Sequence, residues 1–233
     1  MTGLPERQIE VTAVGKRFGA RWVLRGVTLG VRRGEAVGLL GSNGTGKSTV
    51  LRVIGTLLRP NSGTVSVNGI DAVRDADLAR EQVGYLAHTP GLYDDLTARE
   101  NLAFAADMLG MPRTIVDAML DRVGLDDVAN ERVRGFSAGM QRRVALGRLI
   151  MRKASVLLLD EPYANLDANG VSLMNSLIKE TIREGGAALI GLHETAPARG
   201  VLDRVLTLMD GRVDSAHADK TGPRTALAMS EQT

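Results

Sequence analysis

We predict an α/β fold, in which a mostly parallel sheet follows an antiparallel β-rich start and is interrupted by a helical subdomain. Three observations support this prediction. A short apolar stretch at residues 36–40 leads into a glycine-rich turn and then into apolar residues at helical spacing. The pattern from about residue 96 to residue 151 is mostly helical. Strand and helix patterns alternate after residue 156, which is typical of a parallel sheet with helical connections.

The individual elements follow from local patterns. Val27, Leu29 and Val31 alternate with more polar or smaller residues, which is the period of a half-buried strand. Residues 97–100 have the spacing of a capping box and should open a helix. In chain order, strands are predicted within residues 9–31 and at 36–40, 64–71, 156–159, 187–192 and 205–209, with turns at Asn68 and Gly69 and at Asp210 and Gly211.

We expect a single domain over residues 1–215. Its core and β subdomain are predicted at residues 1–86 and 152–215, and its helical subdomain at residues 87–151. Residues 216–233 are polar and show no periodicity, which indicates a flexible tail.

Composition excludes several classes of protein. The chain has 233 residues, of which 44% are hydrophobic and 24% charged, so it can bury a substantial core. A net charge of only +2 disfavours a nucleic-acid partner. Without cysteine there is no disulfide and no thiolate metal site. No apolar run approaches the roughly 18 residues of a membrane span, and the first residues lack a signal core. We therefore expect a soluble, cytosolic protein that can still bind a membrane partner.

The glycine-rich turn fits the pattern G-x-x-x-x-G-K-[ST] of a phosphate-binding loop, or P-loop. Its backbone N–H groups and the positive end of the following helix dipole favour an anion. Lys47 is placed to reach the β and γ phosphates of a nucleotide, and Ser48 to bind Mg²⁺. The predicted binding residues are Gly41, Ser42, Asn43, Gly44, Thr45, Gly46, Lys47, Ser48 and Thr49. An ordinary Gly-rich turn is the alternative, which this strand–turn–helix setting disfavours.

A second apolar strand, at residues 156–159, runs into the two carboxylates Asp160 and Glu161. The carboxyl end of a buried strand opens onto the ligand crevice of an α/β sheet. Asp160 is therefore expected to hold Mg²⁺, directly or through water. Glu161 is expected to act as general base or to orient the attacking water. Acids at a helix start would be unremarkable alone, but together with a P-loop they indicate nucleotide hydrolysis.

Beyond these two motifs, the chain resembles the nucleotide-binding subunits of ATP-binding-cassette (ABC) transporters from about residue 9 to residue 213. Residues 136–143 are similar to the family signature, usually written LSGGQ. Ser137 and Gly139 are kept, and a hydroxyl and a bare backbone at a helix N-terminus suit further phosphate contacts. The departures are Phe136, Ala138 and Met140. The resemblance implies a P-loop NTPase core, ATP and Mg²⁺ as cofactors, and ATP hydrolysis.

Three further positions match the family pattern. Phe18 falls where an aromatic ring usually stacks on adenine, and Trp22 is the competing aromatic. Asp167 fits the D-loop, which touches the opposite subunit in this family. His193 fits the switch histidine, which senses the γ-phosphate. The resemblance therefore places Phe18 and Asp167 among the nucleotide-site residues, and His193 beside Lys47 and Glu161 as catalytic.

One chain supplies one P-loop and one signature. Both can contact the same γ-phosphate if two copies pack head to tail in the presence of ATP, so we expect an ATP-dependent homodimer. In each site Lys47 and Ser137 are expected to stabilise phosphate charge. Coupling to a membrane partner is expected to run through the segment around His88 and the helical insert.

Histidine at position 88 departs from the glutamine that is usual in the family. Imidazole is a softer ligand than Mg²⁺ prefers, so His88 either contributes to the nucleotide site or only couples it to the partner. His88 and the residues that follow it resemble the CcmA ATPases of cytochrome c maturation, as do residues 136–146. That resemblance implies haem export, the membrane partners CcmB and CcmC, and a peripheral location at the cytoplasmic face of the inner membrane.

Two alternatives remain open at this point. The ATPases of ABC-2-type drug or polysaccharide exporters share every nucleotide motif, although glutamine at position 88 and a longer C-terminal domain would have favoured them. Non-transport ABC ATPases that remodel nucleic acids or ribosomes usually carry two cassettes or long inserts, neither of which is present in this sequence.

Overall fold

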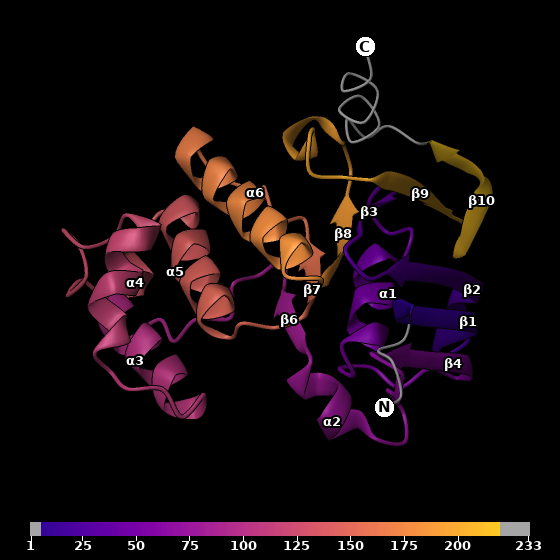
Figure 1. Cartoon of the computed structure of the whole chain (residues 1–233), viewed down its shortest axis with the longest axis horizontal. Coiled ribbons are helices and arrows are strands. Elements are labelled where there is room, and N and C mark those ends of the chain that lie inside the picture. Colours follow the sequence, from indigo (N-terminus) through magenta and orange to yellow (C-terminus); the bar gives the residue numbers. More distant parts are fainter. Residues whose placement is uncertain (1–5, 220–233) are drawn as a thin grey trace, which may run out of the picture. The chain divides into compact units, whose positions relative to one another are not determined.

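The computed structural model describes residues 6–219, and the side chains of residues 6–214 (Figure 1). Residues 216–219, which we expected to begin a flexible tail, form the end of strand β10 (Arg212–Asp219). Residues 220–233, the rest of that predicted tail, lie outside the described residues. Within residues 6–219 no helix is both long and apolar enough to cross a membrane.

The chain divides into two compact units, described separately below. The first consists of Met1–Tyr85, Ala154–Glu161 and Ile178–Thr233, and the second of Leu86–Lys153 and Pro162–Leu177. The second unit differs from the helical subdomain expected at residues 87–151, because it also takes in the residues that directly follow the predicted catalytic carboxylate.

The first unit is built on a six-stranded sheet in the order β10-β9-β3-β8-β7-β6. Strands β3, β8 and β9 run parallel, as do β7 and β8, whereas β10 is antiparallel to β9. The predicted α/β fold is therefore confirmed. The bounds are β3 (Ala36–Leu40), β6 (Val83–Leu86), β7 (Val156–Asp160), β8 (Ala187–Leu192) and β9 (Arg204–Met209). All five residues of β7 and all six of β8 are buried, as expected for strands covered on both faces.

A four-stranded antiparallel sheet in the order β2-β1-β4-β5 also belongs to the first unit. The strand region predicted within residues 9–31 is the long hairpin β1 (Arg7–Phe18) and β2 (Arg21–Arg32). The region predicted at 64–71 is β4 (Ser62–Val67) and β5 (Ile70–Asp71). Asn68 and Gly69 join them with φ values of 52° and 79°, which is the conformation expected of an Asn-Gly hairpin turn.

Among the described residues, the first unit also contains the helices α1 (Lys47–Ile54) and α2 (Ala76–Glu81), a 3₁₀ turn η2 (Ala196–Ala198) and the end of α6, which is described with the second unit. Leu51 and Ile54 of α1 are fully buried and join one hydrophobic core with Val37, Leu39 and Leu158 of the sheet. Helix α1 is thereby fixed on the sheet directly after the P-loop.

The second unit is helical. It contains α3 (Ala98–Met108), α4 (Ile115–Val123), η1 (Val133–Gly135), α5 (Ala138–Met151) and the start of α6 (Ala168–Arg183), whose residues from Ile178 belong to the first unit. The predicted capping box opens α3, since Thr97 Oγ1 accepts from the Glu100 N–H at 3.1 Å and Glu100 Oε2 accepts from the Thr97 N–H at 2.8 Å. On α5, a Cβ at Gly147 would lie 3.1 Å from Leu102 and 3.2 Å from Met119, so a bare backbone lets α3 and α4 pack closely on α5.

The turn between β9 and β10 is held against β2 in the first unit. The Arg25 N–H donates to the Gly211 carbonyl at 2.8 Å. Gly211 has φ +73°, and a Cβ there would lie 2.3 Å from the Val23 carbonyl oxygen. Only glycine meets both conditions without a shift of the backbone.

We therefore predict that Gly211→Ala lowers the free energy of unfolding by about 2 kcal/mol or more, because the left-handed backbone costs roughly 1–2 kcal/mol and the clash adds to it. Gly200→Ala is the matched control, since Gly200 also has a positive φ, +79°, but faces open space. Urea denaturation of both variants makes the comparison. Equal losses would contradict the close contact.

Candidate functional site

The P-loop joins the end of β3 to the start of α1. Gly46 precedes the helix with φ 109° and ψ 8°, and a Cβ there would lie 2.9 Å from a methyl carbon of Leu24. A Cβ at Gly41 would lie 2.7 Å from Thr45 Oγ1 and 2.8 Å from the Leu208 carbonyl. Side chains are thus excluded where the backbone must curve. No side chain caps α1, so the N–H groups of its first turn are left to an anion.

Lys47 lies at the centre of the site and is only 6% exposed. Its Nζ donates to the carbonyl oxygens of Gly41, at 2.7 Å, and Ser42, at 3.3 Å. It also lies 3.2 Å from Glu161 Oε1. His193 Nδ1 lies 2.8 Å from Glu161 Oε2. The structure therefore brings together the three residues predicted to be catalytic, Lys47, Glu161 and His193.

The backbone of Glu161 is unusual. It has φ +48°, in the left-handed region that residues with a side chain rarely adopt, at a cost of roughly 1–3 kcal/mol. The Glu161 N–H donates to the Gly191 carbonyl at 3.0 Å, which holds the residue at the end of β8. This turn of the chain directs the carboxylate towards Lys47 and His193. The sequence gives no sign of it.

The hydrogen bond between His193 and Glu161 also sets the tautomer of the histidine. An ionised carboxylate can only accept, so His193 donates to Glu161 through Nδ1–H, while Nε2 is an acceptor in the neutral imidazole and a donor in the imidazolium. The Nε2 atom lies 3.9 Å from Glu194 Oε1, which is too long for a hydrogen bond. His193 is 61% exposed, so Nε2 is accessible to a ligand.

The residues predicted to bind Mg²⁺ are suited to it. Asp160 ends the buried strand β7 and is 1% exposed. It pairs with Gly191, where a Cβ would lie 3.5 Å from Asp160 Oδ1 and 3.2 Å from Leu51 of α1, so this carboxylate lies beside the helix that contains Ser48. A carboxylate and a hydroxyl are the hard oxygen donors that Mg²⁺ prefers.

A hollow of about 530 Å³ adjoins the P-loop. Its walls include Trp22 and Arg25 of β2, Asn43 and Thr45 of the P-loop, and Asp210 of the turn between β9 and β10. Phe18, the predicted adenine-stacking residue, is not part of this lining.

Phe18 is 48% exposed, and the Lys16 ammonium lies over its ring, with Nζ 5.4 Å from the ring centre. Trp22 is 43% exposed and has the Arg17 guanidinium 5.9 Å from its ring centre. Both rings belong to the end of the β1–β2 hairpin, where Phe18 pairs with Arg21 and Arg17 pairs with Trp22. The hairpin therefore offers two aromatic rings for a base.

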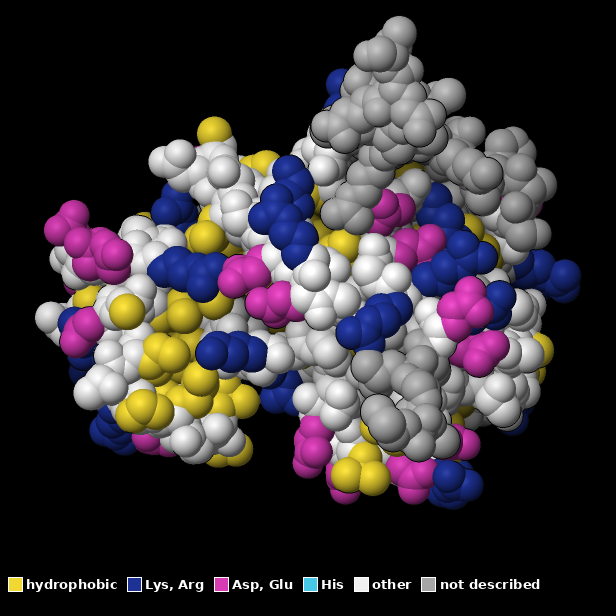
Figure 2. All heavy atoms as spheres, in the orientation of Figure 1, with side chains coloured by type: hydrophobic (Ala, Val, Ile, Leu, Met, Phe, Trp, Pro, Cys, Tyr) yellow, Lys and Arg dark blue, Asp and Glu magenta, His cyan; other side chains and the backbone are white. Residues whose placement is uncertain are grey.

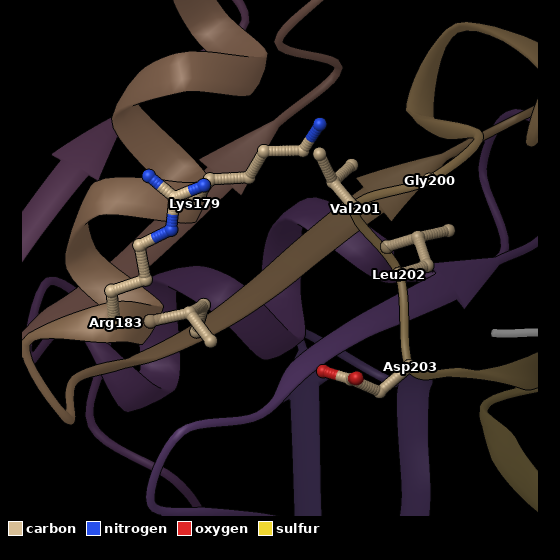
Figure 3. A pocket seen from close by; sticks show the side chains of 7 residues that line it. Lys179, Arg183, Gly200, Val201, Leu202 and Asp203 are labelled. Atoms are coloured by element: carbon tan, nitrogen blue, oxygen red, sulfur yellow. The ribbon is translucent and has the colours of Figure 1, made fainter. Parts of the chain in front are cut away.

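A smaller hollow of about 200 Å³ in the first unit is not the nucleotide site. Lys179 and Arg183 of α6 lie on one side of it and residues 200–203 on the other (Figure 3). Asp203 Oδ2 accepts from the N–H of Ala36, the first residue of β3. This hollow thus lies at the amino end of β3, whereas the P-loop follows its carboxyl end, where α/β sheets bind ligands.

The signature residues lie in the second unit, at the N-terminus of α5. Ser137 is the N-cap, and its Oγ accepts from the Met140 N–H at 3.2 Å. The hydroxyl proton of Ser137 therefore remains available for a phosphate oxygen. A Cβ at Gly139 would lie 2.6 Å from the Asn165 carbonyl oxygen. Glycine is thus required at position 139 for packing against the D-loop, apart from any contact with a ligand.

Asp167 is engaged within its own chain. Its Oδ1 accepts from the Gly170 N–H at 2.9 Å, and its two oxygens lie 2.6 and 2.8 Å from Arg143 Nη2. The Gly170 N–H and then the Arg143 guanidinium lower the pKa of the Asp167 carboxyl below its usual range. The D-loop is therefore joined to the signature helix by a charged hydrogen bond, a contact that the sequence interpretation did not include.

His88 is exposed and lies in the second unit. Its backbone is held by Arg142, which is 2% exposed. Arg142 Nη1 donates to the carbonyls of Ala87 and His88, and Nε donates to the Pro162 carbonyl at 3.4 Å. The sequence patterns assign no role to Arg142 or Arg143. A buried arginine on a helix is not distinguishable from an exposed one in a single sequence.

The chain is similar to known proteins over the region that contains these motifs. The family profile described as "ABC transporter" matches residues 24–164. The cytochrome c biogenesis ATP-binding export protein CcmA 2 of Cupriavidus metallidurans is 41% identical over 202 residues, covering 84% of this chain and 94% of the relative. The ATP-binding protein NatA of Bacillus subtilis is 35% identical, covering 82% and 79%. The daunorubicin resistance protein DrrA3 of Streptomyces coeruleorubidus is 33% identical, covering 98% and 75%.

Solved structures show the same fold. The ATP-binding subunit of an ABC transporter superposes with a TM-score of 0.80 at 30% identity, covering 88% of both chains. The cassette MJ0796, solved as a dimer in a post-hydrolysis state bound to ADP and Pi, superposes with a TM-score of 0.79 at 28% identity, covering 88% of this chain and 96% of that one. With a P-loop, a paired Lys47 and Glu161, and relatives of this kind over most of its length, the chain belongs to the ABC transporter family as an ATP-hydrolysing, ATP-binding subunit.

Proposed function

We propose that this ATPase serves a CcmA-like transporter, in haem export or cytochrome c maturation. The proposal is supported by 41% identity to a CcmA protein over 94% of that protein's length, and by histidine at position 88. The drug-resistance ATPase DrrA3 and the ATP-binding protein NatA are similar to a lesser degree, so an ABC-2-type exporter is the second candidate.

The observation that carries the catalytic proposal is the cluster of Lys47, Glu161 and His193. The ammonium of Lys47 and the N–H groups at the start of α1 provide positive charge for the β and γ phosphates. Glu161 accepts a proton from water or orients it for attack, and the Nδ1–H of His193 holds that carboxylate in place. When both ring nitrogens of His193 carry a proton, its Nε2–H can donate to a phosphate oxygen, and we propose that it contacts the γ-phosphate in this form. Mg²⁺, held by Ser48 and Asp160, would neutralise charge that develops on the phosphates.

The remaining nucleotide contacts come from a second copy of the chain in this proposal. Ser137 and Gly139 form a helix tip with a hydroxyl proton and backbone N–H groups to offer. Head-to-tail packing would place that tip over the γ-phosphate bound by the other copy. Asp167, although its carboxylate is held by Arg143, is proposed to lie at the same interface through its loop. Loss of the γ-phosphate would then weaken the closed pair.

A membrane subunit, CcmB- or CcmC-like, is proposed to bind the second unit at the cytoplasmic face of the inner membrane. Hydrophobic side chains gather on the face of this unit shown in Figure 2. Tyr93, Phe104 and Met108 are exposed residues of this unit, and the ring centroids of Tyr93 and Phe104 lie 5.0 Å apart in an edge-to-face arrangement. Asn101, which is 1% exposed, exchanges hydrogen bonds with the backbone of Tyr93 and so fixes this loop on α3. His88 is proposed to pass movement between this surface and the nucleotide.

Glu161→Gln should keep ATP binding but lower the rate of hydrolysis at least about a hundredfold, as expected for loss of a general base. Its affinity for ATP should also rise, because the neutral amide no longer competes with phosphate for Lys47. Phosphate release and nucleotide titration measure the two effects. Turnover near the wild-type rate would remove Glu161 from its proposed role.

Phe18→Ala should raise the Kd for ATP about tenfold or more, since stacking on a base contributes about 1–3 kcal/mol. Binding of inorganic tripolyphosphate, which has no base, should not change. Trp22→Ala is the matched variant on the same hairpin. If Trp22→Ala weakens ATP binding and Phe18→Ala does not, the base lies in the hollow beside Trp22 and the assignment of Phe18 is wrong.

Met108→Glu should abolish co-purification with a co-expressed CcmB-like membrane subunit while basal ATP hydrolysis stays unchanged, because a charge cannot be buried unpaired in an apolar interface. Leu78→Glu, at an exposed apolar position of α2 in the first unit, is the control. Co-purification that survives Met108→Glu but not Leu78→Glu would place the partner elsewhere.

A further inference from the structure

We infer that Arg142 is a positioning residue that transmits movement of residues 87–88 to the backbone that carries the catalytic carboxylate. The inference rests on the proposed function and concerns the regulation of the same site. Through this one side chain, movement of the segment proposed to face the membrane subunit would change the position of the catalytic carboxylate and so the rate of hydrolysis.

Arg142 joins segments that are far apart in sequence. It lies on α5, five residues after the signature Ser137 and almost completely buried. Its Nη1 donates to two successive carbonyls, those of Ala87 and His88, and its Nε donates to the carbonyl of Pro162. All of these atoms belong to the second unit. The guanidinium is a rigid plane, so a shift of residues 87–88 has to be accommodated either by α5 or by Pro162.

Pro162 is the point at which such a shift would matter for catalysis. It directly follows Glu161, whose backbone is held in the left-handed region with φ +48°. On its other side Glu161 is held by the hydrogen bond from its N–H to Gly191. A residue with a side chain stays in this conformation only when its surroundings enforce it. Arg142 contributes one of these restraints through the peptide next to Glu161, and its loss would let the carboxylate leave its place beside Lys47 and His193.

The signature helix is joined to the same stretch of chain at two further points. Arg143 pairs with Asp167, and Gly139 packs against the Asn165 carbonyl. Both partners lie within eight residues of Glu161 along the chain. Helix α5 and residues 162–170 are therefore expected to move together, and the Arg142 side chain joins residues 87–88 to them. Substitution of Arg142 should therefore uncouple residues 87–88 from Pro162 while the signature residues Ser137 and Gly139 keep their structure.

Amide hydrogen exchange in the Glu161→Gln background, with and without Mg-ATP, tests this directly. Without further change, Mg-ATP should slow exchange both at residues 137–141 and at residues 86–89, by about tenfold or more. Adding Arg142→Gln should keep the effect at 137–141 and reduce the effect at 86–89 to less than about twofold. Arg142→Lys should give an intermediate loss at 86–89, because an ammonium cannot span both sets of carbonyls.

Arg148→Gln is the matched control. Arg148 lies on the same helix and donates to the Gly91 carbonyl at 2.8 Å in the same loop, so it contacts the loop at a different point from Arg142. It should leave both responses intact. In the otherwise wild-type protein, Arg142→Gln should lower kcat about tenfold while the KM for ATP changes less than about twofold. Arg148→Gln should change neither kcat nor KM.

An undiminished response at residues 86–89 in Arg142→Gln overturns the inference. If that variant does not fold, the decision passes to Arg142→Lys, and a full response there overturns the inference as well. If the Glu161→Gln protein without further changes fails to bind Mg-ATP, that result would instead overturn the proposed function, and the inference with it. The two failures are thus distinguishable by nucleotide binding alone.

Discussion

The chemistry of the first unit depends on one buried cation. Lys47 is the first residue of α1, where the helix dipole disfavours positive charge. The structure holds it there with two P-loop carbonyls and the carboxylate of Glu161. Positive charge is thus concentrated in a water-poor place before any phosphate arrives, and such preorganised charge is what stabilises a phosphoryl-transfer transition state. The glycines of the loop, the strained Glu161 and the hydrogen bond from His193 all serve to keep this arrangement.

Much of this arrangement was predictable from the sequence because it is local. The P-loop residues are contiguous, and Asp160 follows an apolar strand that has to be buried. The capping box at Thr97 and the Asn68 turn follow rules that involve only a few neighbouring residues. The α/β class follows from the order of periodic patterns. In each case the residues that determine the structure lie next to one another along the chain.

What the sequence could not show depends on tertiary contacts. Gly139 suggests a phosphate contact, yet its bare backbone is also needed against the Asn165 carbonyl. Arg142 and Arg143 look alike in the sequence, but one is buried among three carbonyls and the other is paired with Asp167. Glu161 adopts a left-handed backbone conformation although it is not a glycine, the residue type that would have indicated such a conformation in the sequence. The hollow beside the P-loop includes Trp22, while the family pattern points to Phe18. These contacts are also the ones that connect the motifs.

We propose that two copies of the chain enclose ATP between the P-loop of one and the Ser137–Gly139 helix tip of the other. Sedimentation velocity of the Glu161→Gln protein with and without Mg-ATP measures this most directly. We expect a monomer without nucleotide and a dimer with Mg-ATP. No dimer should form when Ser137→Asp is added, since aspartate keeps the N-cap of α5 while its carboxylate would repel the γ-phosphate. A protein that binds Mg-ATP yet sediments as a monomer at every concentration tested, also in the presence of its membrane subunits, would contradict the account.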